Sequence, residues 1–219
     1  MEKKLSAVVF DMDGVLFDTE RLCLIVWKKI AEKYGLDKVE EVYHKTIGRT
    51  TADTKIIVAE TYPDIDVEEV YGELRQVMHC TIAEDGLPVK PYAEEILIAL
   101  KERGVPTALA SSTRQATVEA QLEMAGFTKY FDAVIGGDTI EHSKPAPDIY
   151  LAACERLSVK PEEAAAVEDS FNGIRSAHAA GLYAVMVPDL LQPDDEMKTL
   201  ADVIAADLNE AKEVIFAKL

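Results

Sequence analysis

Two aspartates separated by one residue, Asp11 and Asp13, follow a short apolar run, VVF at 8–10. In extended backbone, residues i and i+2 point to the same side, so both carboxylates can face one cleft. Gly14 comes next and permits a tight turn or the close approach of a ligand. One aspartate after a strand most simply caps a turn. The pair, together with further acids at another strand end, indicates a site that carries out chemistry.

A second acidic pair, Glu168 and Asp169, follows the apolar run AAAV at 164–167. Four carboxylates that converge in one cleft repel one another unless a cation neutralises them. Oxygen ligands without a nearby histidine or cysteine favour Mg²⁺ over zinc or copper, so the sequence predicts Mg²⁺ as the cofactor. Asp169 could instead be the N-cap of the helix expected after it, in which case Glu168 would be the ligand.

Groups suited to an anion occur at two more places. The segment ASST at 110–113 ends an apolar run just before an expected helix, whose amino-terminal N–H groups and dipole attract a phosphate. Equally, Ser111, Ser112 or Thr113 could simply be the N-cap of that helix. Lys144 lies in HSKPAPDIY, where two prolines restrict the chain before a helix. Beside the acids, its ammonium could neutralise the oxygens of a transferring phosphoryl group.

The elements that would position these residues alternate between strands and helices. Short apolar runs predict buried parallel strands at 5–10, 106–110, 132–136, 164–167 and 183–187. Helical segments are expected between or after them at 92–103, 114–125, 147–157, 171–180 and 207–218. Three of these helices stop at glycines typical of left-handed C-caps, Gly104, Gly126 and Gly181. The alternation predicts an α/β fold.

Residues 20–86 depart from this alternation, because they hold several helical stretches and no convincing strand. We expect them to form an insertion of about four helices. Its connections would pass the carboxyl edge of the first strand, which is where open α/β sheets bind ligands. The sequence therefore predicts a cap over the site. The expected domains are a core of residues 1–16 and 88–219 and a cap of residues 17–87.

The composition restricts the class of partner. With 40 acidic and 23 basic residues the net charge is -17, which argues against nucleic acid and anionic membranes as partners. No run approaches the roughly 18 to 20 apolar residues that span a bilayer, and the amino terminus does not resemble a secretory signal, so a cytoplasmic location is expected. Three widely spaced cysteines, Cys23, Cys80 and Cys154, suit reduced thiols. The sequence carries no signal of an oligomeric state.

Four motifs in order, DMDGVLFDTE, ASST, SKPAPDIY and VEDSFNGI, resemble those of the haloacid dehalogenase superfamily. The chain is most similar to the β-phosphoglucomutase-like branch, which carries a helical cap, and the likeness covers essentially its whole length. The resemblance implies an α/β fold with a Rossmann-like, doubly wound parallel sheet as the core and an inserted four-helix cap domain.

The resemblance also implies a role for each site residue. Asp11 would attack phosphorus and form an aspartyl-phosphate, and Asp13 would protonate the leaving oxygen and then activate water. The implied Mg²⁺ ligands are the Asp11 carboxylate, the Asp13 backbone carbonyl, Asp169 and, as a further inner or outer ligand, Glu168. The implied phosphate-binding groups are Ser111, the Ser112 amide and Lys144.

Departures from the mutase pattern favour hydrolysis. Cys23 aligns with a histidine of the related mutases, and Ile47 and Thr51 align with a lysine and an arginine. Without cap groups that hold a bisphosphate intermediate, water should take the phosphoryl group from Asp11. We therefore expect a phosphatase that acts on a small phosphorylated metabolite, with sugar phosphates as the favoured class.

Two other functions stay open. One is a β-phosphoglucomutase-type phosphosugar mutase, and the other is a non-enzymatic, receiver-like regulatory module that binds phosphate. A receiver needs neither a cap nor a general acid such as Asp13, and dehalogenases of the superfamily lack this second aspartate. Arg49, between two cap helices, is the candidate contact for the leaving group of the substrate, and the simpler interpretation is an exposed loop arginine.

Overall fold

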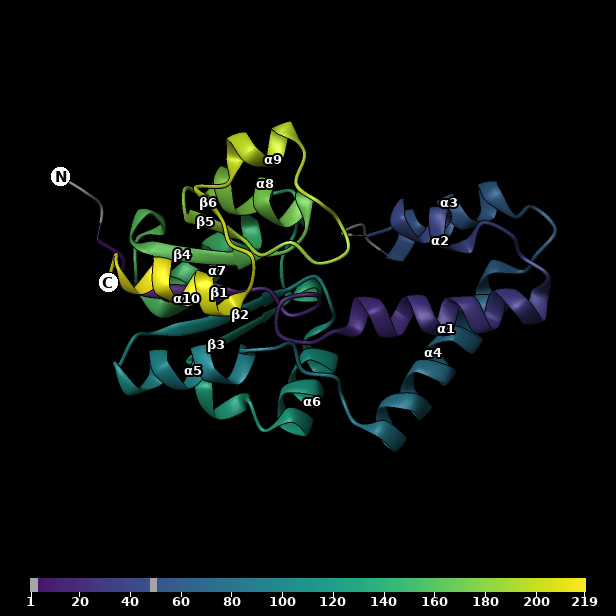
Figure 1. Cartoon of the computed structure of the whole chain (residues 1–219), viewed down its shortest axis with the longest axis horizontal. Helices are drawn as coiled ribbons and strands as arrows, with labels where there is room; N and C mark the ends of the chain where they lie inside the picture. The colour runs from purple at the N-terminus through teal and green to yellow at the C-terminus, as the bar shows by residue number, and fades with distance from the viewer. Residues whose placement is uncertain (1–3, 48–50) are drawn as a thin grey trace. The chain divides into compact units, whose positions relative to one another are not determined.

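The computed structural model describes residues 4–47 and 51–219 (Figure 1). The chain divides into two compact units. The first, which we call the sheet unit, comprises Met1–Phe17 and Val89–Leu219, and the second, the helical unit, comprises Asp18–Pro88. These boundaries lie one residue from those expected from the sequence.

The sheet unit is built on six parallel strands in the order β3-β2-β1-β4-β5-β6. The strands are β1 (Ala7–Phe10), β2 (Thr107–Ser111), β3 (Ala133–Gly136), β4 (Ala164–Glu168), β5 (Tyr183–Met186) and β6 (Val203–Ile204). The predicted doubly wound α/β fold is thus confirmed, with all five expected strands in place. The sixth strand was not predicted, because two residues are too few to form a recognisable apolar run.

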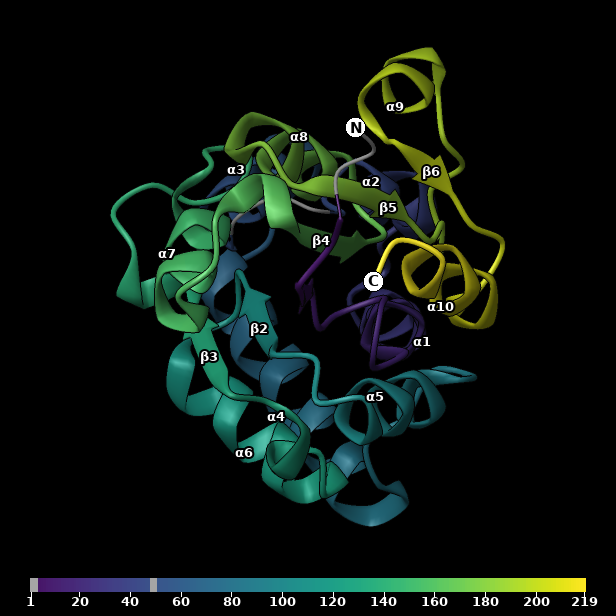
Figure 2. The ribbon, with the colours of Figure 1, turned by 90° about the vertical axis from the view of Figure 1, so that its left-hand side faces the viewer.

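Helices cover both faces of this sheet. Figure 2 shows α7 (Asp148–Leu157) and α8 (Phe171–Ala180) on one side of it, and α5 (Ala93–Glu102) and α10 (Leu208–Phe216) on the other. Helix α6 (Gln115–Ala125) packs against β3, and α9 (Asp195–Leu200), which was not predicted, packs against α8. Three short 3₁₀ segments complete the unit: η1 (Thr128–Tyr130), η2 (Gly137–Thr139) and η3 (Pro161–Glu163).

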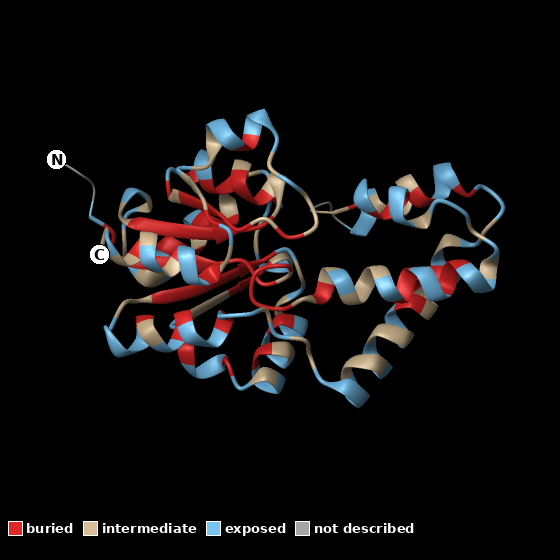
Figure 3. Ribbon diagram, viewed as in Figure 1, coloured by how far each residue is buried: buried red, intermediate tan, exposed pale blue. Residues whose placement is uncertain are grey.

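The central strands β1, β2 and β4 are buried on both faces, which explains their nearly continuous apolar sequences (Figure 3). Ala7 and Val9 of β1 belong to a core cluster with Ile149 and Tyr150 of α7. Their neighbours in β1 are also fully buried, since side chains alternate between the two faces of a sheet.

The predicted left-handed glycines at the helix ends are confirmed, with φ of 66° at Gly104, 70° at Gly126 and 84° at Gly181.

The described part of the helical unit holds four helices, α1 (Thr19–Tyr34), α2 (Val39–His44), α3 (Thr51–Thr61) and α4 (Val67–Asp85). They enclose a small core of their own, in which the rings of Trp27 and Tyr71 meet edge to face with centroids 5.5 Å apart. An exposed ion pair between Lys33 and Glu73, 2.6 Å long, links α1 to α4.

Across the described segments of the chain, no helix is both long enough and apolar enough to cross a membrane.

The two chain segments that join the units run side by side. The amide of Lys90 donates to the carbonyl of Leu16 at 2.9 Å, and the amide of Asp18 donates to the carbonyl of Pro88 at 2.8 Å. The Lys90 ammonium also pairs with the buried Asp189 carboxylate at 2.8 Å, in the loop after β5. The outgoing and returning segments are therefore paired by their backbones and fastened to the sheet unit by an ion pair.

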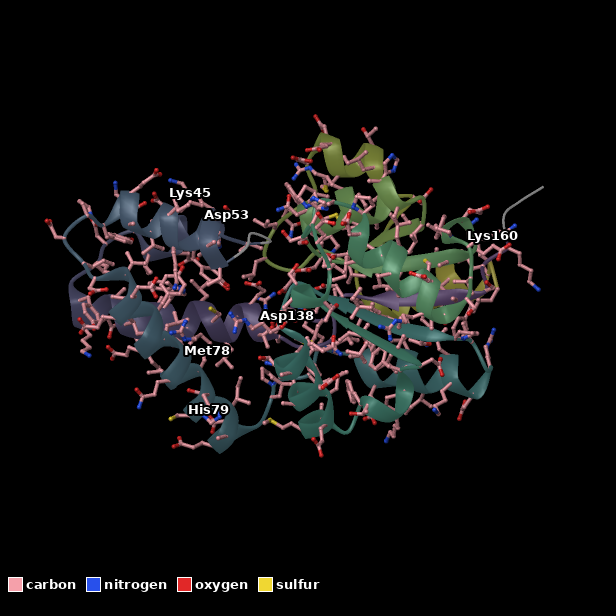
Figure 4. All side chains as sticks on the ribbon, turned by 180° about the vertical axis from the view of Figure 1, so that it is seen from behind. Lys45, Asp53, Met78, His79, Asp138 and Lys160 are labelled. Carbon is pink, nitrogen blue, oxygen red and sulfur yellow. The ribbon has the colours of Figure 1, made fainter. Side chains whose placement is uncertain are left out.

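Helix α6 begins later than the hydroxyl-rich segment before it. Its N-cap position is Arg114, whose side chain makes no capping hydrogen bond, so the possibility that Ser111, Ser112 or Thr113 is the N-cap is wrong. The amide of Gln115 instead donates to Asp138 Oδ1 at 2.8 Å. Asp138, labelled in Figure 4, belongs to η2 after the neighbouring strand β3. A side chain from a different loop thus caps α6 and leaves residues 111–113 available to the site.

We predict that Asp138→Ala lowers the free energy of unfolding by about 1 kcal/mol, the usual loss when a helix cap is removed. Asp138→Asn keeps a side-chain oxygen and should lose less. Urea unfolding followed by circular dichroism measures both, with Glu123→Ala on the exposed face of α6 as a control that leaves the cap in place. Equal stability of Asp138→Ala and wild type would show that Asp138 does not cap the helix.

Candidate active site

The sequence-predicted site residues of the sheet unit meet at the carboxyl edge of the sheet. Asp11 follows β1 directly, Ser111 is the last residue of β2, and Glu168 is the last residue of β4. In the sheet β1 lies between β2 and β4, and the chain passes from one side of β1 to the other between β3 and β4. This is a topological switch point, where open α/β sheets form their binding crevices.

Lys144, in the segment between η2 and α7, reaches into the acidic cluster. Its ammonium donates to Asp11 Oδ1 at 2.5 Å, to Glu168 Oε1 at 2.6 Å and to the carbonyl of Ala110 at 3.0 Å. Only 5% of its side chain is exposed. Three acceptors therefore fix all three protons of the ammonium, and the lysine predicted from the sequence lies beside the predicted nucleophile.

Glu168 is fully buried, and both of its carboxylate oxygens accept hydrogen bonds. Oε1 accepts from the Lys144 ammonium and from the Tyr150 hydroxyl, which is 2.9 Å away. Oε2 accepts from the amides of Asp169 and Ser170 and from the Ser170 hydroxyl, each at 3.1 Å. The ring of Tyr150 also faces the ammonium, with its centroid 5.2 Å away. Glu168 thus connects the lysine, the turn after β4 and α7.

The donor set for a metal ion is present at the same place. Asp11, Glu168 and Asp169, all buried, each offer a carboxylate oxygen, and these atoms lie within 4.8 Å of one another. Such a set of hard oxygen ligands fits Mg²⁺. Lys144 supplies a single positive charge against these three carboxylates, so a divalent cation would complete the charge balance. The Asp13 carboxylate is not in this group, and the expectation that its backbone carbonyl is a ligand stays a prediction.

Burial and neighbouring charges govern the ionisation of the cluster. Burial raises the pKa of the Asp11 carboxyl, the Lys144 ammonium opposes this rise, and the carboxylates of Glu168 and Asp13 add to it. Burial acts to lower the pKa of Lys144, but Asp11 and Glu168 outweigh it and raise this pKa above its usual value. Lys144 therefore stays charged, whereas a cation near Asp11 would help that carboxyl to ionise.

The predicted acid and base, Asp13, lies next to the hydroxyl-rich segment. Thr113 Oγ1 donates to Asp13 Oδ2 at 3.0 Å. The Thr113 amide donates to Ser111 Oγ at 3.1 Å, and Ser111 is itself buried. Ser112, in contrast, is exposed at the same edge of the sheet. The loop after β1, the last residue of β2 and the loop that follows it thus bring Asp13, Ser111 and Ser112 to the same edge of the sheet, and their roles there stay predictions.

Two glycines make room for the carboxylates. Gly14 has φ +82°, and a Cβ atom there would overlap the Asp169 carboxylate. A Cβ atom at Gly173, in the first turn of α8, would overlap the Glu168 carboxylate. The N-cap of α8 is Ser170, whose side chain accepts from the amide of Gly173 at 3.0 Å. The alternative that Asp169 is the N-cap is therefore wrong.

Sequence reasoning missed two contributors to the cluster, Tyr150 and Ser170, and considered Thr113 only as part of the hydroxyl-rich segment or as a helix cap, not as a partner of Asp13. Tyr150 carries a hydroxyl on the otherwise apolar buried face of α7, and this was the signal that could have revealed it. Arg49, the predicted contact for a leaving group, lies outside the described residues.

Comparison with known proteins agrees with this geometry. A family model of the haloacid dehalogenase-like hydrolases matches residues 5–181. The phosphorylated carbohydrates phosphatase of Thermotoga maritima is 31% identical over 211 residues, which cover 96% of this chain and 97% of that protein. The fructose-1-phosphate phosphatase YqaB of Escherichia coli is 29% identical, covering 85% of this chain and 98% of its own.

A solved structure extends the likeness in fold. The β-phosphoglucomutase of Clostridium difficile superposes with a TM-score of 0.78 and covers 98% of this chain and 96% of its own. At 24% sequence identity this match shows a shared fold and does not distinguish a phosphatase from a mutase.

We predict that Gly173→Ala lowers the free energy of unfolding by about 1–3 kcal/mol, because the added methyl group displaces the buried Glu168 carboxylate. The matched control is Gly72→Ala in α4, where a Cβ atom meets nothing within 4 Å and should stabilise the helix by roughly 0.5–1 kcal/mol. Thermal or urea unfolding measures both variants. If they behave alike, the close approach of α8 to Glu168 has no energetic consequence.

Proposed function

The chain belongs to the haloacid dehalogenase-like hydrolases, and within this family we propose that it is a Mg²⁺-dependent phosphatase of a small phosphorylated metabolite. The observation that carries the proposal is the buried contact of Lys144 with Asp11, at the sheet edge where Asp13 and Ser111 also lie. A nucleophilic carboxylate, a fixed positive charge and a second carboxylate are the groups that phosphoryl transfer requires. The similarity to two phosphatases of phosphorylated sugars supports a sugar phosphate as the substrate class.

In the first step, we expect Asp11 to attack phosphorus, which forms a bond between its carboxylate oxygen and phosphorus. The bond between phosphorus and the ester oxygen breaks, and Asp13 gives its proton to the departing alkoxide. Lys144 and Ser111 stabilise the phosphoryl oxygens during the transfer, together with the Ser112 amide. The product is an aspartyl-phosphate and a free alcohol.

In the second step, Asp13 takes a proton from a water molecule that attacks the aspartyl-phosphate. The bond between phosphorus and the Asp11 oxygen breaks, inorganic phosphate leaves, and the original carboxylate is restored. The residues proposed to hold Mg²⁺ are Asp11, Asp169 and the Asp13 backbone carbonyl, with Glu168 as a further inner or outer ligand. When bound, Mg²⁺ supplies positive charge that offsets the carboxylates and the phosphoryl group.

The helical unit is proposed to act as the cap that determines which phosphate ester reaches the site. Its insertion directly after the loop that holds Asp11 and Asp13 supports this role. Arg49 remains the proposed contact for the leaving group.

We predict that the protein releases phosphate from a panel of sugar phosphates and other small phosphate esters only when Mg²⁺ is present. EDTA should abolish the release, and Asp11→Asn should reduce it by at least about 10⁴-fold, as expected for loss of a nucleophile. Asp64→Asn, an exposed position in the helical unit, is the matched control. Phosphate release that persists in Asp11→Asn would exclude Asp11 as the nucleophile, and a lack of any turnover would favour the receiver-like alternative.

We also predict that β-glucose 1-phosphate, supplied with a bisphosphate primer, yields free phosphate and not glucose 6-phosphate. The physical reason is that Cys23, Ile47 and Thr51 offer no formal positive charge with which to hold a bisphosphate while it reorients. A coupled glucose 6-phosphate dehydrogenase assay, run beside a phosphate assay, separates the two products. Formation of glucose 6-phosphate without free phosphate would identify the chain as a mutase.

A further inference from the structure

The hydroxyl of Thr113 contacts the carboxylate proposed as the general acid. Thr113 Oγ1 lies 3.0 Å from Asp13 Oδ2, and neither residue is fully exposed. The sheet register accounts for this contact, because Phe10 of β1 pairs with Leu109 of β2. Asp13 and Thr113 lie three and four residues beyond this pair on neighbouring chain segments, which brings their side chains within hydrogen-bond reach.

The backbone of Thr113 is held independently of its side chain. Its amide donates to Ser111 Oγ at 3.1 Å, and its carbonyl accepts from the amide of Gly137 at 2.8 Å. These bonds fix the backbone that carries the hydroxyl from two sides, one from Ser111 at the end of β2 and one from η2 after β3. A group held in this way can orient a partner, because little further conformational entropy is lost when the contact forms.

Orientation matters most for a carboxyl group that transfers a proton. A general acid must lie within hydrogen-bond reach of the oxygen that it protonates, and a small misplacement strongly reduces the rate. We propose that Thr113 is a positioning residue for Asp13, whose hydroxyl holds one carboxylate oxygen and so directs the group toward the leaving oxygen of the substrate. This inference rests on the proposed phosphatase function and on the role of Asp13 within it.

The contact should affect one class of substrate more than another. A strongly basic alkoxide needs a proton as it leaves, whereas p-nitrophenoxide is weakly basic and can leave without one. Loss of the hydroxyl should therefore reduce the hydrolysis of benzyl phosphate much more than that of p-nitrophenyl phosphate. A change that only disturbed the fold or phosphate binding would reduce both alike.

The test compares kcat/KM for benzyl phosphate and p-nitrophenyl phosphate with Mg²⁺ present. This constant covers the steps up to departure of the leaving group, so the later action of Asp13 on water does not enter. Thr113→Val, which is nearly isosteric, should lower kcat/KM for benzyl phosphate about tenfold and that for p-nitrophenyl phosphate less than about twofold. Thr113→Ser should restore the wild-type ratio, and Thr117→Val, on the exposed face of α6, should leave both constants unchanged.

Asp13→Asn, measured in parallel, separates failure of this inference from failure of the proposed function. It should lower kcat/KM for benzyl phosphate about 100- to 10,000-fold and affect p-nitrophenyl phosphate less. If Asp13→Asn shows this selectivity and Thr113→Val does not, the positioning role is wrong and the phosphatase mechanism stands. If Asp13→Asn affects both esters equally, Asp13 is not the general acid. Thr113 then cannot position it for that role, and the proposal is wrong.

Discussion

The contact of one buried ammonium with two buried carboxylates constrains the whole sheet edge. Taking a charge out of water costs several kcal/mol, and removing one partner of a buried ion pair typically costs about 3–5 kcal/mol. Lys144, Asp11 and Glu168 are therefore tolerated in the interior only together. The strand order supplies the two acids from the ends of β1 and β4, and the segment before α7 supplies the lysine. The charge that a phosphoryl group would meet is thus already fixed by the fold.

Neutral hydrogen-bond donors satisfy the acceptor sites of Glu168 that the Lys144 ammonium does not occupy. The Tyr150 hydroxyl and the amide and hydroxyl of Ser170 occupy the remaining acceptor sites of Glu168, so its carboxylate is satisfied even without access to water. The close approach of α8 that brings the donors of Ser170 to Glu168 depends on the missing side chain at Gly173. Folding stability and the orientation of Lys144 consequently depend on the same few contacts, which is common where a site is built from the ends of core elements.

Much of this arrangement was predictable because it is encoded in short, local patterns. Apolar runs and helix-ending glycines located five strands and their connecting helices, and motifs at the strand ends identified Asp11, Lys144, Glu168 and Asp169 as neighbours. The structure added contacts that depend on tertiary packing. The cap of α6 comes from Asp138, 23 residues beyond the amide of Gln115 that it accepts from. Likewise, no spacing rule specifies that the Tyr150 hydroxyl meets Glu168, since this depends on how α7 rests on the sheet.

The pairing of the two connecting segments has a consequence for how this chain can be modified. The backbones of Asp18 and Pro88, the first and last residues of the helical unit, are joined by a 2.8 Å hydrogen bond. The chain therefore leaves the sheet unit and returns to it at a single point. The strands that carry the chemistry are hydrogen-bonded to one another, and their pairing does not depend on the length or composition of what lies between these two residues. The helical unit is therefore an exchangeable module, which protein engineers could shorten or graft, and in which mutations can accumulate without breaking the strand pairing of the sheet unit.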